Sequence, residues 1–373
     1  MRLFHLQDAH LKPQTWASVP AVKGDAYQAL DQVLLKISYI HEGPGKPVLI
    51  VSGDLFDSTR VYASDLEAVQ KMCSRCHVYY ILGTHDYTSP PFLSSMPNTT
   101  WLQNGAIEVL EDGTRLSGIQ YTRSREQLLQ SLELLRKRGF GATCDSRDIL
   151  VLHQGVQHLL GFEGAFQLTL QDLLEYVPNA LVLCGHVHKQ DYSPFETLPM
   201  GLDAKGAFLS TGPLYPQEMP QTKAFCGFDE IEWNQGESLE VTHHPIKVRN
   251  YGTIDSTDPK LKGLIKFAEQ MAIKNQLLPP LVNITIAPGT TLQSLGIRDE
   301  DYPGAILRPV VVNTQEQVLG TEEPTVESFT LEDAVKEEIR DPDDQTLMLE
   351  LLHSENPETA LRNLLKEQKV ETR

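Results

Sequence analysis

The chain of 373 residues is 40% hydrophobic and has few low-complexity stretches, as expected for a globular protein of one large domain or two to three smaller ones. Its longest unbroken apolar runs, such as 48–51, are too short to span a membrane. The net charge of −18 argues against a protein that coats DNA, because affinity for phosphates normally comes from Lys and Arg.

The acidic charge is distributed unevenly. Residues 321–373 hold 15 Asp and Glu against 6 Lys and Arg, so half of the net charge lies there. Bound divalent cations would reverse the field around acidic residues in the remainder, so the charge does not exclude a nucleic-acid substrate. The first six residues lack the apolar core of a signal peptide, and five scattered Cys indicate a reducing compartment. We therefore expect a cytoplasmic protein.

Five short apolar runs in the first half of the chain predict buried strands, and each ends in a side chain able to bind a metal. The predicted strands are 1–6, 48–52, 78–82, 148–152 and 180–184. The potential ligands that follow them are Asp8, His10, Asp54, His85, His153, His186 and His188. One such strand end is unremarkable, but five in sequence predict a metal site along one edge of a sheet.

The stretches between these strands predict packing and turns. Apolar residues recur on one face of a helix at 26–40 and again at 125–138, and 64–72 also favours a helix. Short strands and turns are expected over 99–120. Cys73-x-x-Cys76 lacks the second ligand pair that a zinc site needs, so we interpret the two thiols as half-buried groups at a helix end.

The motifs DxH (Asp8, His10), GDLFD (Asp54), GTHD (Thr84, His85), His153 and GHVH (His186, His188) resemble those of the calcineurin-like metallophosphoesterases over roughly the first 215 residues. Within that superfamily the chain is most similar to SbcD-type nucleases, the nuclease subunits of a double-strand-break repair complex. GDLFD, the segment 210–213 (STGP) and the helical tail support the narrower resemblance.

The resemblance implies an α/β fold: a metallophosphoesterase β-sandwich flanked by helices, with a small α/β capping domain and a helical C-terminal tail. It also implies two Mn²⁺ ions, with Mg²⁺ a poorer substitute. Asp8, His10 and His188 would bind one ion and His153 and His186 the other, with Asp54 bridging both. His85 would contact the scissile phosphate or protonate the leaving oxygen, and Asp86 could orient its ring. Asp57 is assigned a lesser part, as a helix cap or a support for a neighbouring group.

Thr84 departs from the family pattern, which usually has Asn there as a ligand of the second ion. A Thr hydroxyl can coordinate a metal but reaches it less readily than the longer Asn side chain. We therefore predict a weaker second metal site, filled only at higher Mn²⁺ concentration.

We expect a nuclease domain over 1–250 and a capping domain that helps to select DNA over 251–314. The capping domain would contain a helix at 260–273 and strands at 281–286 and 305–312. An acidic linker, 315–328, would precede short amphipathic helices in 329–373.

The resembled family implies a Mn-dependent DNA nuclease, with double-strand exonuclease and single-strand endonuclease activity, that acts in DNA recombination and repair. It would bind an SbcC-type coiled-coil ABC ATPase through 329–373, with no membrane partner. A homodimer is also implied, although the Pro-rich segment after Asp86 predicts a reduced or different dimer surface. Two alternatives stay open: another calcineurin-like metallophosphoesterase, acting on cyclic nucleotides or phosphoproteins, and a catalytically weak scaffold. The tail helices could also pack on their own chain.

Overall fold

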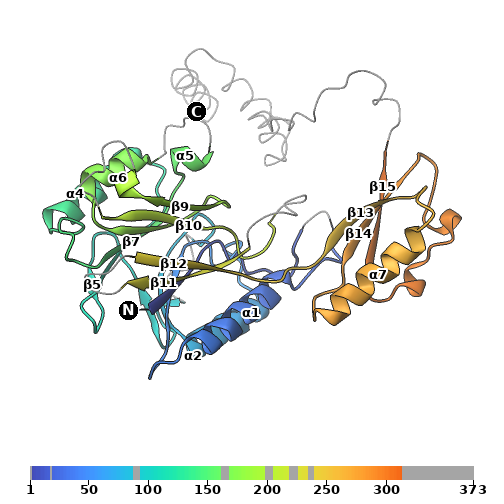
Figure 1. Ribbon diagram of the computed structural model, residues 1–373, viewed down its shortest axis with the longest axis horizontal. Helices are drawn as coiled ribbons and strands as arrows, with labels where there is room; N and C mark the ends of the chain where they lie inside the picture. The colour runs from blue at the N-terminus through green and yellow to red at the C-terminus, as the bar shows by residue number, and fades with distance from the viewer. Residues whose placement is uncertain are drawn as a thin grey trace, which may run out of the picture. The chain divides into compact units, whose positions relative to one another are not determined.

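The computed structural model describes residues 2–16, 19–86, 93–160, 168–197, 205–217, 226–233 and 239–312 (Figure 1). All of them belong to one compact unit, Met1–Val312, and a second unit comprises Asn313–Arg373. The predicted linker and tail helices, from residue 315 onward, lie outside the described residues, as does part of the Pro-rich segment after Asp86. Within the described part of the chain, no helix combines the length and apolar character needed to cross a bilayer.

The first sheet has the strand order β12-β11-β1-β2-β3-β4. Four of its strands are parallel: β1 (Arg2–Leu6), β2 (Val48–Ser52), β3 (His77–Ile81) and β4 (Thr99–Trp101). Two antiparallel strands, β11 (Gly227–Trp233) and β12 (Leu239–Pro245), extend the sheet beyond β1. Helices α1 (Asp25–Ile40) and α2 (Ala63–Arg75) cover its outer face through one apolar cluster, which confirms the predicted buried stripe of α1.

The second sheet has the strand order β5-β6-β7-β8-β10-β9. Its strands are β5 (Glu108–Val109), β6 (Arg115–Ile119), β7 (Asp148–His153), β8 (Leu181–Gly185), β10 (Ala207–Thr211) and β9 (Gln190–Pro194). Strands β6, β7, β8 and β10 are parallel. Helices α4 (Arg125–Lys137) and α6 (Leu170–Tyr176) pack on its outer face, and the short helix α5 (Gln157–Leu160) follows β7.

The inner faces of the two sheets pack against each other. One buried cluster joins Leu3 and Ile50 of the first sheet to Val151 and Leu183 of the second. The result is a pair of mixed sheets with helices on both outer faces, which agrees with the expected sandwich. The expectation that the ligands lie along the edge of one sheet is wrong, because their strands are divided between two sheets that meet face to face.

A third sheet follows, formed by three parallel strands, β13 (Tyr251–Asp255), β14 (Leu281–Ile286) and β15 (Ile306–Val311). Helix α7 (Leu261–Lys274) packs on it through Leu261 and Ile265. Strand β13 was not predicted, because its polar residues show no apolar run. Leu264, on the same helix, is 37% exposed. The division into separate domains at residue 250 stays a prediction.

Candidate metal centre

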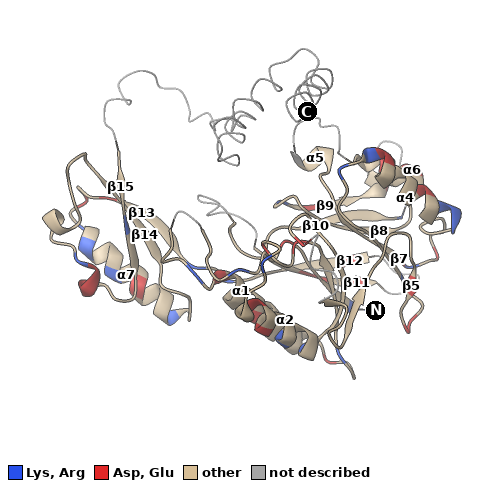
Figure 2. Cartoon of the chain, turned by 180° about the vertical axis from the view of Figure 1, so that it is seen from behind, with Lys and Arg blue, Asp and Glu red and all other residues tan. Residues whose placement is uncertain are grey.

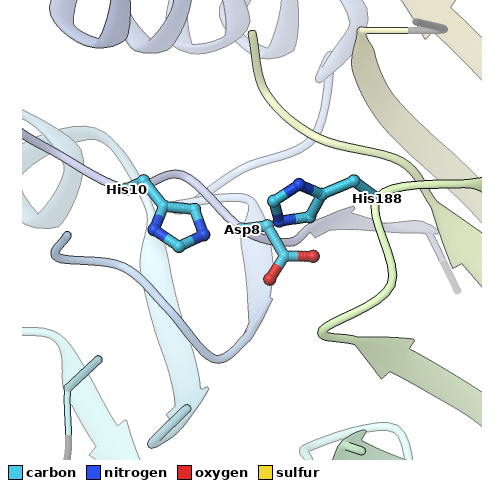
Figure 3. A group of neighbouring side chains, drawn as sticks. All are labelled: Asp8, His10 and His188. Atoms are coloured by element: carbon cyan, nitrogen blue, oxygen red, sulfur yellow. The ribbon is translucent and has the colours of Figure 1, made fainter. Parts of the chain in front are cut away.

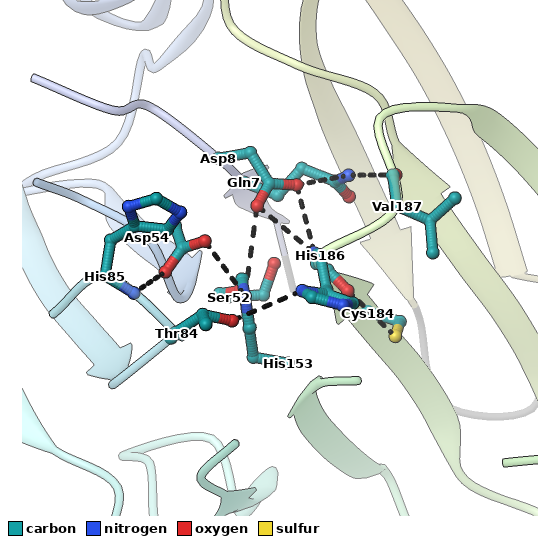
Figure 4. A network of polar contacts seen from close by, with 12 residues as sticks. Gln7, Asp8, Ser52, Asp54, Thr84, His85, His153, Cys184, His186 and Val187 are labelled. Atoms are coloured by element: carbon teal, nitrogen blue, oxygen red, sulfur yellow. Dashed lines mark hydrogen bonds and ion pairs between the residues drawn. The ribbon is translucent and has the colours of Figure 1, made fainter. Parts of the chain in front are cut away.

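The potential ligands converge at the carboxyl ends of parallel strands from the first two sheets (Figures 3 and 4). In the first sheet, Asp8 and His10 follow β1, Asp54 follows β2, and Thr84 and His85 follow β3. In the second, His153 ends β7, and His186 and His188 follow β8. Parallel strands place their carboxyl ends at the same edge of a sheet. The face-to-face packing brings the two edges together.

The backbone at this centre adopts a conformation that residues other than glycine rarely take. The φ angles are 47° at Asp8, 40° at His10, 48° at Asp54 and 91° at His186. Such left-handed residues cost of order 1–3 kcal/mol each and cluster at functional sites. Because four potential ligands have such φ angles, the surrounding structure must hold their backbone in a conformation that these residues do not favour by themselves.

Glycines before three of the ligands allow the strand ends to approach closely. A Cβ at Gly53 would overlap the His153 ring and approach the backbone of Gly83, while a Cβ at Gly83 would overlap Asp54. A Cβ at Gly185 would meet the carbonyl oxygen of Ser52, in the neighbouring sheet. Gly53 and Gly185 are therefore needed where the two sheets meet, and Gly83 is needed where the ends of β2 and β3 lie side by side.

The first candidate group comprises Asp8, His10 and His188, whose ligand atoms all lie within 4.8 Å of one another (Figure 3). Asp8 is held by its neighbours: Gln7 Nε2 donates to Oδ2 at 2.9 Å, and the His186 amide donates to both carboxylate oxygens at 3.1 Å. Both ring nitrogens of His10 are buried and form no hydrogen bond with any described residue. Buried polar atoms are normally paired, so a metal ion fits this group.

The second candidate group comprises Asp54, His153 and His186, again within 4.8 Å. His153 Nδ1 lies 2.8 Å from the Ser52 carbonyl oxygen, which can only accept, so Nδ1 carries the proton. Its Nε2 lies 3.1 Å from Asp54 Oδ2, so this nitrogen faces the carboxylate as an N–H when the ring is charged and as a lone pair when the ring is neutral. An imidazole that donates one N–H to a carbonyl and presents its other nitrogen is the usual form of a metal-binding histidine.

A third group, His10, Asp57 and His85, shares His10 with the first. Asp54 lies between the first and second groups. Its Oδ2 is 3.1 Å from His153 Nε2 and 3.7 Å from His10 Nε2, while its Oδ1 accepts from the His85 amide at 2.8 Å. Burial alone would raise the pKa of Asp54, but the imidazoles of His153 and His10 hold it well below its usual range. Burial would lower the pKa of His153, yet the charges of Asp54 and Asp8 raise it to about 9. The centre therefore favours a positive charge beside Asp54.

Residues 1–190, just over half of the chain, match the calcineurin-like phosphoesterase family. The chain belongs to this family. It is also 28% identical over 203 residues to the DNA double-strand break repair protein Mre11 of Saccharolobus solfataricus. That similarity covers 50% of this chain and 49% of its relative, so the chain matches about half of the length of the archaeal protein.

Thr84 of this phosphoesterase lies beside the second group. Its Oγ1 is 3.3 Å from His186 Nδ1. Thr84 occupies the position of the Asn that is usual in the family motif, and its hydroxyl contacts the His186 imidazole.

The next two residues, His85 and Asp86, have different surroundings. The His85 ring is exposed, and its Nδ1 lies 2.6 Å from the Asp57 carbonyl oxygen, which orients it. The Asp86 carboxylate is buried and accepts from the amides of Leu55, Phe56 and Gly83, at 3.0, 2.8 and 3.2 Å. Asp86 thus holds the GDLFD loop, whereas the contact that orients the His85 ring comes from Asp57.

Sequence reasoning gave too little weight to Asp57 and Gln7. Asp57 Oδ1 lies 3.4 Å from His10 Nδ1 and 2.6 Å from Lys12 Nζ, and these partners outweigh burial and lower its pKa to about 2. Besides holding Asp8, Gln7 accepts from the Thr211 amide at 2.9 Å. The second Asp of GDLFD was a usable signal for Asp57. A buried Gln beside a ligand leaves no comparable pattern.

The CxxC pair has no part in the centre. Cys73 and Cys76 are almost fully buried rather than half-buried, and burial raises the pKa of Cys73 to about 11 and of Cys76 to about 12. Within the described ranges, no candidate metal group includes a cysteine.

Proposed function

We propose that this phosphoesterase is a DNA nuclease that hydrolyses phosphodiesters with two Mn²⁺ ions in DNA recombination and repair. The observation that carries the proposal is the pair of Asp/His groups with Asp54 between them. Two divalent ions can polarise a phosphodiester, supply a hydroxide at neutral pH and stabilise the leaving oxygen. The similarity to a DNA repair protein supports DNA as the substrate.

In this proposal the side chains have distinct roles. Asp8, His10 and His188 hold the first ion, and His153, His186 and Thr84 hold the second, with Asp54 shared. Because the pKa of Asp54 lies well below its usual range, the carboxylate keeps its charge throughout the neutral range. Imidazole-rich donor sets suit Mn²⁺ better than Mg²⁺, which prefers oxygen ligands.

His85 is the proposed general acid or phosphate contact. Its Nδ1 donates to the Asp57 carbonyl oxygen, so Nε2 on the exposed ring is the atom able to meet the substrate. Asp86 acts as a positioning residue, because its carboxylate fixes the backbone that follows Asp54, at Leu55 and Phe56, and the turn at Gly83.

Basic side chains offer contacts for a DNA backbone on an otherwise acidic chain. Lys262, Lys266 and Lys274 are exposed on α7, where Figure 2 shows blue segments, and form no ion pair within the described ranges. A cavity of about 450 Å³ beside Asp57 is lined in part by Lys12 and Arg60. Phosphate contacts of this kind would position DNA without reading its sequence.

The remaining parts of the proposal concern partners. We assign residues 251–314 to a capping domain that selects DNA and residues 329–373 to a tail that binds an SbcC-type coiled-coil ATPase through its apolar faces. A homodimer is also proposed. The support for these assignments is the family resemblance and the amphipathic pattern of the tail.

The test is hydrolysis by the purified chain with Mn²⁺. We expect cleavage of duplex DNA and of bis-p-nitrophenyl phosphate, and about 100-fold or greater loss of both activities in His85→Ala and His188→Ala, in line with the usual contribution of such groups. His158→Ala is the matched control, because this ring pairs with Asp191 outside the centre. Cleavage of bis-p-nitrophenyl phosphate or a cyclic nucleotide without DNA cleavage would favour a different phosphodiesterase. No hydrolysis of any substrate would favour a scaffold.

A further inference from the structure

A cavity of about 800 Å³ opens beside the second metal group. Its lining residues come from the ends of β3, β4 and β6 and the start of α4: Leu82, Thr84, Trp101, Asn104, Gln120, Tyr121, Thr122, Arg123 and Gln127. The volume lies within the range of sites that enclose small organic molecules. No proposed metal ligand except Thr84 lines it, so it is additional to the metal centre.

Two contacts join the cavity to the metal centre. Thr84, on its wall, has its hydroxyl 3.3 Å from His186 Nδ1. The Tyr121 ring has its centroid 5.4 Å from that of His186 and 6.2 Å from that of His153. A group in the cavity would therefore be next to a phosphate held at the metals.

The cavity offers flat aromatic surfaces in a fixed frame. Trp101 Nε1 donates to Gln120 Oε1 at 3.2 Å, so the polar atom of the indole is already paired. Gln120 also bonds the backbone at Leu82 and Leu102, which locks this wall to the ends of β3 and β4. Aromatic rings that need no rearrangement are suited to stacking with a planar heterocycle.

Polar groups at the same cavity are able to bind the rest of a nucleotide. Asn104 Oδ1 accepts from the backbone N–H of Gln120 at 2.8 Å, and Asn104 Nδ2 donates to no described residue. Arg123 is exposed and forms no ion pair in the part of the chain that the structure describes. An amide N–H₂ can bind a base edge, and a guanidinium can bind a phosphate.

We propose that this cavity binds one unpaired nucleobase of the DNA strand, stacked on Tyr121 and adjoining the phosphate that is cleaved. The inference rests on the proposed nuclease function and adds a substrate preference to it. A base inside a duplex has its edge paired and its faces covered by neighbours, so it must be unstacked before it can enter. The enzyme therefore favours single-stranded or frayed DNA over a closed duplex end.

The test combines a change in the substrate with a change in the protein. An oligonucleotide that lacks one base beside the cleaved bond should be cut about tenfold less efficiently by the native chain, measured as kcat/KM. Tyr121→Leu, which removes the aromatic face, should lose this difference between intact and abasic DNA, and Tyr121→Phe should keep it. Bis-p-nitrophenyl phosphate, which has no base, supplies the reference rate for each variant.

Arg123→Gln provides a second variant at an exposed side chain that is no part of the core. It should raise the KM for single-stranded DNA several-fold. It should also reduce, by about one, the slope of the logarithm of the binding constant against the logarithm of salt concentration. Arg136→Gln, on the exposed face of α4, is the matched control.

Three results would overturn the inference. The first is an equal penalty for the missing base in the native chain and in Tyr121→Leu. The second is a native preference for fully paired ends. The third is hydrolysis of bis-p-nitrophenyl phosphate without DNA cleavage, which would refute the nuclease proposal itself, whereas the first two would leave that proposal intact.

Discussion

His5, three residues before the first ligand, is a fully buried histidine, and burial favours its neutral form. Thr211 Oγ1 donates to Asp229 Oδ2 at 2.7 Å, so it accepts from His5 Nδ1, also at 2.7 Å. His5 Nε2 then accepts from the Ser52 hydroxyl at 2.9 Å. Burial disfavours the charged imidazolium and lowers the pKa of His5 to about 4, against the opposing charges of Asp229 and Asp8. Ser52 links this network to His153 through its carbonyl oxygen.

Replacement of His5 by Gln should change how stability depends on pH. The folded pKa of about 4 lies below the unfolded value of 6.5, so the unfolded chain binds more protons between these values. This histidine therefore lowers the free energy of unfolding as pH falls from about 6.5 to 4, by about 3 kcal/mol in all. Urea unfolding in chelator should show a shallower decline in that window for His5→Gln. An identical pH dependence in both proteins would refute the assignment.

Thr84→Asn should strengthen the second metal site. The longer amide oxygen can reach an ion held by His153 and His186, so the Mn²⁺ concentration for half-maximal activity should fall by about tenfold. Thr122→Asn, which changes the same cavity without contacting His186, should leave the titration unchanged. Coincident Mn²⁺ titrations of the native chain and Thr84→Asn would show that Thr84 does not weaken the site.

At the scale of elements, strand ends and the glycines beside them set the geometry of the centre. Gly53 has φ +85°, and a Cβ there would overlap the His153 ring. Gly113 also has φ +85°, but no atom lies within 4 Å of the position that a Cβ would take. Alanine variants at these two glycines therefore distinguish the cost of backbone strain from the cost of crowding between the sheets.

Gly53→Ala should therefore destabilise the fold more than Gly113→Ala. The left-handed conformation costs both variants about 1–2 kcal/mol, and overpacking adds about 1–3 kcal/mol only at Gly53. The free energy of unfolding from urea titration measures the difference. Equal losses in the two variants would mean that the sheets can separate locally without cost.

Much of the strand and helix pattern could be predicted because apolar periodicity is local. The range 48–52 for β2 was predicted without error, and 281–286 for β14 likewise. Strand β13 was missed because its residues are mostly polar and none of them is buried. The partition of the ligand strands between two sheets was also missed, since strand order depends on contacts between distant residues that a run of apolar residues does not specify.

At the metal centre too, features set by local sequence could be predicted, whereas contacts between distant residues could not. Asp8, His10 and His188 could be expected together because motif and strand end coincide, and the structure brings them within 4.8 Å. The contact of Asp57 with His10 and the orienting of His85 by a carbonyl oxygen depend on loop conformation. A backbone carbonyl carries no side-chain signature, so the sequence could not indicate it.

At the scale of the whole molecule, charge is divided between a body and an acidic C-terminal segment. Residues 357–367 carry Leu361, Leu364 and Leu365 at helical spacing. The helix predicted there would be too short to be stable without another surface.

If the proposed coiled-coil ATPase binds this segment, Leu361→Asp with Leu364→Asp should abolish its co-purification, because charge cannot be buried in an apolar contact. Hydrolysis of bis-p-nitrophenyl phosphate should continue, and Glu358→Gln is the control. Loss of hydrolysis together with loss of the partner would instead indicate that these helices pack on their own chain.

The two-ion centre is the claim on which the functional account depends. Anomalous scattering from crystals soaked in manganese tests it directly. The account predicts two peaks, one among Asp8, His10 and His188 and one among Asp54, His153 and His186, with Asp54 next to both. No peak among these side chains at millimolar manganese, or peaks only elsewhere on the molecule, would contradict it.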